Sequence, residues 1–193
     1  MAHESSRRDE LAHAATDFAL EHGLIGLSLR PLAAAIGTSD RMLLYHFADK
    51  DDLVATVLRV SSDWSVGVLR ALPPAPDVRR AVLDLWTATT SDRMDRCQRM
   101  YVEAAALGLL GREPYATVVK EANRRWVEAL ADQLVAAGST PARARRAVVL
   151  LDAAFMGFQL DLPLDAGDPE VRRAVRDLAD AVVAITSAGQ GKA

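Results

Sequence analysis

Apolar residues recur every three or four positions along almost the whole chain, which predicts an all-α protein. In the first predicted helix, from about Ser6 to His22, one face is formed by Leu11, Ala14, Ala15, Phe18 and Ala19. No stretch alternates polar and apolar residues with an enrichment in β-branched side chains, so we expect no strands. Half of the residues are hydrophobic but only 5% are aromatic, which is typical of a helical protein rich in Ala, Leu and Val.

Glycine and proline divide the rest of this pattern into further helices. The clearest break is Pro73-Pro74-Ala75-Pro76, and Gly111, Gly138 and Gly167 mark other ends. After the first helix, the expected helices span about residues 29–36, 40–46, 50–72, 78–90, 91–110, 114–137, 141–160 and 169–187.

The stretch from Ser28 to Lys50 is predicted to be two short helices joined by a tight turn. Gly37 follows the last apolar residue of the first helix, where a helix C-terminus favours a residue that tolerates positive φ. Thr38 and Ser39 are both plausible N-caps for the second helix. That helix is expected to run from Asp40 to about His46, with Leu43 and Phe47 facing inward. This is the layout of a helix-turn-helix, whose second helix enters the DNA major groove.

The same stretch resembles the TetR family of bacterial transcriptional regulators. The resemblance rests on the order Leu29-Arg30, Leu32-Ala33, Gly37, Leu43-Leu44-Tyr45-His46-Phe47 and Asp49-Lys50. It covers roughly the first 60 residues, and beyond them only the helical layout is similar. It implies a homodimer that binds a pseudo-palindromic operator in double-stranded DNA, with two heads about 34–36 Å apart. It further implies a repressor that is released by a small apolar or amphipathic effector.

The expected domain layout follows from this resemblance and from the proline-rich break. Residues 6–60 form the helix-turn-helix DNA-binding domain, and residues 61–187 form a helical ligand-sensing and dimerisation domain. We place the border within the helix of residues 50–72, because the head needs only its first turns. Residues 1–5 and 188–193 are expected to be flexible tails.

The expected DNA contacts come from the two short helices and the start of the next. Arg30 is a candidate for a phosphate or a base edge, or else a solvated surface residue. Arg41 could pair with a guanine. Asp40 could accept from a cytosine, but we favour a role at the positive helix N-terminus. The full candidate set is Arg30, Ser39, Asp40, Arg41, Leu44, Tyr45, His46 and Lys50.

The residues before His46 depart from the family pattern. Most relatives have a tyrosine where this chain has Leu44, and here Tyr45 follows instead. Leu44 is therefore a candidate for contact with a thymine methyl group, and Tyr45 for a bond to a phosphate. His46 is either a phosphate contact or a half-buried structural histidine. Lys50 stands at a helix N-terminus, where backbone N–H groups favour a phosphate.

Charge alone does not indicate a nucleic-acid-binding protein. The formal net charge is -3, and residues 1–59 hold six basic and nine acidic residues. An acidic head counts against DNA binding if overall charge is the test. Local placement matters more, because Arg30, Arg41 and Lys50 stand where the motif would meet DNA. We therefore expect binding that weakens at high salt, without broad nonspecific affinity.

The C-terminal half carries the expected dimer and effector sites. The helix Pro141–Leu160 is apolar almost all round, and Pro169–Ser187 has a stripe made by Val171, Val175, Leu178, Val182 and Ile185. These two helices are the expected dimer interface, although the stripe could equally be buried within one subunit. The effector candidates, which could also simply be core residues, are Trp86, Tyr101, Trp126, Phe155, Met156 and Phe158.

Other classes of function find little support. All four histidines fall in the first quarter of the chain, and no Gly-rich phosphate loop is present. We therefore expect no enzyme, cofactor or metal site. The lone Cys97 is expected to be a buried thiol, with a redox sensor as the alternative. No secretory signal or membrane span is recognisable, so we expect a cytoplasmic protein with no membrane partner.

Two alternatives to a repressor stay open from the sequence. The first is an activator with the same DNA-binding head. The second is a helical ligand-binding or protein-interaction module that does not use DNA, which the acidic head and Leu44 keep open.

Overall fold

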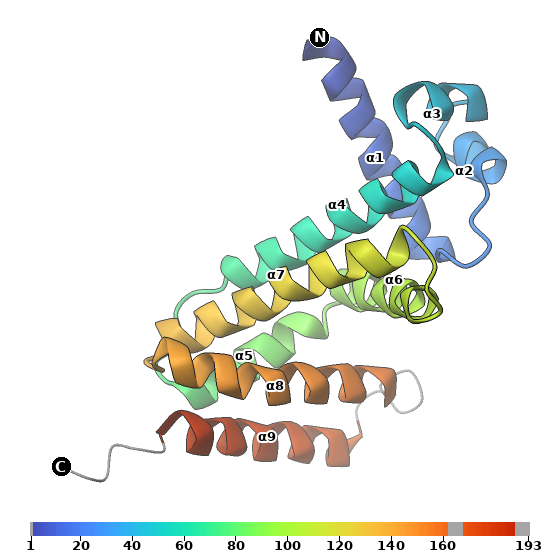
Figure 1. Ribbon diagram of the computed structural model, residues 1–193. Coiled ribbons are helices and arrows are strands. Elements are labelled where there is room, and N and C mark those ends of the chain that lie inside the picture. Colours follow the sequence, from blue (N-terminus) through green and yellow to red (C-terminus); the bar gives the residue numbers. More distant parts are fainter. Residues whose placement is uncertain (1, 162–167, 188–193) are drawn as a thin grey trace. The chain divides into compact units, whose positions relative to one another are not determined.

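The computed structural model describes residues 2–161 and 168–187, and every regular element within them is an α-helix (Figure 1). The all-α prediction is confirmed. The helices are α1 Ala2–His22, α2 Leu29–Ala35, α3 Asp40–His46, α4 Lys50–Arg70, α5 Val78–Thr89, α6 Asp92–Leu109, α7 Tyr115–Ala136, α8 Pro141–Asp161 and α9 Pro169–Ser187.

Most helix ends lie within one or two residues of the glycine and proline breaks, but α1 begins earlier than predicted. It starts at Ala2 instead of Ser6, so residues 2–5 are helical and not a separate tail. The reason is that no glycine or proline precedes Gly23, and Ala2 and Glu4 are good helix formers. The predicted C-terminal tail, residues 188–193, lies outside the described residues.

The chain folds into two compact units, each built from separate stretches of sequence. Unit 1 comprises residues 1–65 and 96–123, and unit 2 comprises residues 66–95 and 124–193. The unit borders fall within α4, α6 and α7. The functional border that the sequence predicts near residue 60 stays a prediction.

The helix-turn-helix lies in unit 1 and is held by a buried apolar core. Leu43 and Phe47 have exposed fractions of 0% and 1%, which confirms that they face inward. Cys97 is also buried in this core, as predicted for a structural thiol. The core residues shared by the first four helices include Leu11, Ala15, Leu24, Leu32, Leu43, Phe47 and Leu53.

Side-chain caps fix the start of several helices. The Ser39 Oγ accepts a hydrogen bond from the Met42 N–H at 3.1 Å, so Ser39 and not Thr38 caps α3. Asp49 caps α4 in the same way, with 2.8 Å between its Oδ1 and the Asp52 nitrogen. Ser28 occupies the N-cap position of α2, but its side chain makes no capping hydrogen bond.

In unit 2, α9 packs against α5 and α8, and α8 and α9 run side by side (Figure 1). The stripe on α9 is buried within the unit at Val175, Leu178 and Val182, because α5 and α8 cover it. The stripe therefore belongs to the subunit core and does not itself offer a dimer surface.

On α8, apolar side chains occupy more than the buried face. Val149, Leu150 and Leu160 are 69%, 44% and 53% exposed, although Val148 and Leu151, which flank the first two, are buried. This agrees with the sequence pattern, which places apolar residues almost all round this helix. None of the helices in the described part of the chain combines the length and apolarity needed to cross a bilayer.

We expect Ser39→Ala to lower the free energy of unfolding by about 1 kcal/mol, because α3 loses the acceptor that caps its first turn. Ser28→Ala is the matched control, since Ser28 has the same place on α2 without the bond. It should cost less than about 0.5 kcal/mol. Urea unfolding of both variants measures the difference, and equal losses would contradict the capping role of Ser39.

Candidate nucleic-acid interface

Helix α3 shows one buried and one exposed face, and the exposed face is partly apolar. Leu44 and Tyr45 are 49% and 67% exposed, and Met42 is 43% exposed. Asp40, Arg41, Leu44 and Tyr45 line a shallow depression on this face. Neighbouring exposed apolar residues on so short a helix are typical of a surface that meets a partner.

The first turn of α3 separates its two charges. The Asp40 carboxylate accepts a hydrogen bond from the Arg41 N–H at 2.9 Å, so its negative charge lies at the positive end of the helix. This supports the helix N-terminus role of Asp40 over a contact to cytosine. The Arg41 guanidinium is exposed and forms no ion pair with any of the described residues.

At the other end of α3, Tyr45 and His46 lie with their rings perpendicular and their centroids 5.0 Å apart. Tyr45 is exposed, whereas His46 is half-buried. The half-buried position fits the prediction of a structural histidine at residue 46. The backbone carbonyl of His46 accepts a hydrogen bond from an arginine far away in the sequence.

That arginine is Arg8 of α1, which the sequence analysis did not single out. Its Nε donates to the His46 carbonyl at 3.1 Å, and its guanidinium carbon lies 4.8 Å from the centre of the Phe47 ring. Its Nη2 is 3.4 Å from an oxygen of Asp52, which also accepts from the Ala48 N–H. Arg8 thus holds the C-terminal end of α3 against α1 and α4. No local motif signals this, because 38 residues separate Arg8 from His46.

The remaining cationic candidates are exposed at helix starts. Arg30 lies in the first turn of α2, and Lys50 is the first residue of α4. Neither side chain pairs with an acid within residues 2–161 and 168–187. The charged groups of both residues are therefore exposed to solvent and lie close to helix N-termini, which favour anions.

The effector candidates of unit 2 form an aromatic cluster. The Trp86 ring centroid lies 5.3 Å from that of Phe155 and 5.8 Å from that of Phe158. Phe155 is only 2% exposed, which makes it a core residue, whereas Trp126 and Met156 are half-buried. Tyr101 lies on α6 in unit 1 and stays a prediction from the sequence. No cluster of His, Cys, Asp and Glu suited to a metal ion occurs in the part of the chain described here.

Comparison with known families matches the segment that carries this interface. A model described as "Bacterial regulatory proteins, tetR family" matches residues 11–57, from α1 into α4. The HTH-type transcriptional repressor KstR2 of Mycolicibacterium smegmatis is 36% identical over 63 residues. That alignment covers 33% of this chain and 31% of the repressor, so the chain spans about a third of this curated relative.

Solved structures are similar over most of the chain. A transcriptional regulator from Rhodococcus sp. Rha1 has a TM-score of 0.75 and 24% identity, over 91% of this chain and 95% of its own. The multidrug binding protein EbrR, in its complex with imidazole, has a TM-score of 0.66 and 26% identity, over 91% and 94%. Its complex with proflavin has a TM-score of 0.64 and 25% identity, over 91% and 99%.

Proposed function

Since the chain belongs, through residues 11–57, to the TetR family of bacterial regulatory proteins, we propose that it is a transcriptional regulator that binds operator DNA through α3. The observation that carries this proposal is the exposed face of α3, where Arg41 and Tyr45 flank the apolar Leu44. This face combines a planar cation with an apolar side chain, which suits base edges and thymine methyl groups in the major groove.

The proposed division of roles follows from where each side chain stands. Arg41 reads a base edge and Leu44 a thymine methyl group, because both project from the exposed face of α3. Arg30, Tyr45 and Lys50 contact phosphates and set the register of the head on DNA. The DNA-binding domain proposed here is residues 6–60, and residues 61–187 carry sensing and dimerisation.

We propose a repressor in particular, by analogy with the relative in M. smegmatis, which is named a transcriptional repressor. Release by an effector requires only that effector and DNA favour different arrangements of the two heads, so that each weakens binding of the other. An activator with the same head would bind the same DNA and differ only in its effect on transcription.

Selection of binding sites from a random double-stranded DNA library by the purified protein tests this function. We expect an enriched inverted repeat, because a symmetric dimer presents two equal heads to the duplex. A folded protein that enriches no sequence would favour the alternative of a helical module that does not use DNA.

The same selection with Arg41→Ala should show relaxed preference at one base position in each half-site. Affinity for the wild-type site should fall by about 1–3 kcal/mol, which is the worth of a bidentate contact to a base. Arg124→Ala removes the same charge from an exposed surface pair with Glu128 and serves as the control. Equal affinities for the two variants would remove Arg41 from the interface.

We also propose that the dimer forms through the exposed side of α8, together with α9. The exposed Val149 is followed at steps of one helical turn by Ala153 and Gly157, which are also exposed. Small residues allow a partner helix to approach closely, while Val149 and Leu160 add apolar surface to bury. A two-fold axis beside this helix would bring the same patch of both subunits together.

Val149→Glu should therefore shift the protein from dimer to monomer in sedimentation equilibrium, because it places two charges in a buried interface. Val135→Glu makes the same change on α7, at a residue that is 37% exposed, and should leave the dimer intact. A Val149→Glu protein that remains dimeric would place the interface elsewhere.

For the effector, we propose a small apolar or amphipathic molecule that contacts the aromatic cluster of Trp86, Phe155 and Phe158. Trp126 packs half-buried against the same core, and the half-buried Met156 directly follows Phe155 in α8, so both would complete the contact. The complex of EbrR with the flat aromatic cation proflavin supports this class of molecule. Trp86 is the central residue, because its ring contacts both phenylalanines.

Proflavin itself is a suitable probe for calorimetric titration of the protein. DNA is left out of the titration, because proflavin would intercalate into it. We expect binding that weakens about two- to tenfold in Trp86→Phe, as for loss of an aromatic contact. Trp64→Phe is the control, since the partly buried Trp64 packs against the core of unit 1. Equal weakening in both variants would argue against the aromatic cluster as the site.

A further inference from the structure

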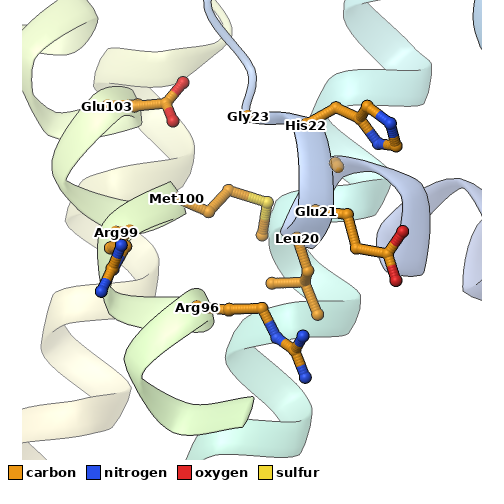
Figure 2. Close-up of a pocket in the computed structure, with 9 residues that line it drawn as sticks. Leu20, Glu21, His22, Gly23, Arg96, Arg99, Met100 and Glu103 are labelled. Carbon is orange, nitrogen blue, oxygen red and sulfur yellow. The ribbon is translucent and has the colours of Figure 1, made fainter. Parts of the chain in front are cut away.

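The turn between α1 and α2 is held by a carboxylate that comes from a distant part of unit 1. The Oε2 of Glu103, on α6, accepts hydrogen bonds from the backbone N–H groups of Leu24 at 2.7 Å and Ile25 at 2.8 Å. Figure 2 shows this side chain reaching from α6 toward the chain at Gly23. Hydrogen bonds to a charged acceptor are stronger than those between neutral groups, so this is a firm attachment.

Gly23 makes the close approach of this carboxylate possible. Its φ of +80° ends α1, and a Cβ built on it would lie 2.7 Å from the Oε1 of Glu103. Any other residue here would meet both a strained backbone and a crowded carboxylate. Gly23 thus meets two requirements of the turn, a positive φ and room for the carboxylate. Its own N–H donates to the Ala19 carbonyl at 2.8 Å, which is the last hydrogen bond of α1.

The attached segment leads directly into the helix-turn-helix. Leu24 is 2% exposed and Leu27 is 6% exposed, and both belong to the core that carries α2 and α3. Ser28 and the first turn of α2 follow at once, and Arg30 lies within that turn. Because the Ser28 side chain makes no capping hydrogen bond, the start of α2 depends on how the turn before it is held.

We propose that Glu103 is a positioning residue for DNA binding: it fixes the turn of residues 23–27 and thereby sets the start of α2 and Arg30 against DNA. This inference rests on the proposed function of the head. Without the attachment, the turn and the first turn of α2 sample more conformations. That freedom must then be lost on the DNA, and affinity falls.

The experiment compares Glu103→Ala, Glu103→Gln and Glu21→Gln. Glu21 lines the same depression beside α6 but is exposed and makes none of the backbone bonds (Figure 2). Glu103→Ala should bind the selected operator about tenfold more weakly, as expected when a charged acceptor is removed. Glu103→Gln should stay within about threefold of wild type, because its amide oxygen can still accept both N–H groups. Glu21→Gln should bind as wild type.

Amide hydrogen exchange separates this positioning role from a general loss of stability. In Glu103→Ala, exchange at Leu24 and Ile25 should accelerate most, while urea unfolding shows each variant folded under the conditions of DNA binding. Unchanged exchange at both amides would overturn the inference, and so would weaker DNA binding by Glu21→Gln equal to that of Glu103→Ala.

Gly23→Ala and Gly26→Ala test the same contact from the other side. Both glycines have positive φ, at +80° and +81°, but a Cβ on Gly26 meets nothing within 4 Å. Gly23→Ala should therefore weaken DNA binding more than Gly26→Ala does when Glu103 is present. In the Glu103→Ala background, Gly23→Ala and Gly26→Ala should weaken DNA binding equally. If Gly23→Ala and Gly26→Ala already have equal effects when Glu103 is present, the contact is contradicted.

If the wild-type protein itself enriches no DNA site, the proposed function fails, and the role of Glu103 in DNA binding fails with it. The exchange rates at Leu24 and Ile25 still decide whether Glu103 holds the turn. Rapid exchange at both amides in the wild type would overturn the attachment itself.

Discussion

The burial of Leu43 and Phe47 is the constraint on which the functional surface depends. Helix α3 has seven residues, and a helix of that length is not stable in water by itself. It exists because Leu43 and Phe47 are almost fully buried in the core of unit 1. Arg8 adds a second hold by donating to the carbonyl of His46 and covering the Phe47 ring. Once these residues face inward, the opposite side of α3 must face outward.

The acidic balance of the head has a structural explanation in the same region. The carboxylates of Asp40, Asp49 and Asp52 each accept a hydrogen bond from a backbone N–H group at or next to a helix start. There they offset the partial positive charge of helix ends, and Asp52 also faces Arg8. The cations Arg30 and Lys50 remain exposed. A head with net negative charge therefore still presents locally positive groups, which a count of charged residues does not reveal.

Features set by neighbouring residues could be predicted from the sequence. The bounds of α3, its inward residues and a cap at Thr38 or Ser39 follow from the sequence, because glycine, proline and capping side chains act within a few positions. The start of α1 is predicted too late, because helix formers such as Ala2 and Glu4 favour a helix at residues 2–5 but do not mark where it begins. The stripe on α9 has the same pattern whether it is covered by helices of its own subunit or by a partner. Periodicity therefore does not distinguish a subunit core from a dimer interface.

The contacts that position the head could not be predicted, because they join residues far apart in the chain. Glu103 is the sharpest case, because 79 residues separate it from Leu24, whose backbone N–H donates a hydrogen bond to its carboxylate. A carboxylate among apolar helix positions indicates only that some donor lies opposite. Gly23 carries the complementary signal, yet a glycine after a helix is already explained by its positive φ. Its second role, to leave room for Glu103, becomes visible only when the two segments are seen together.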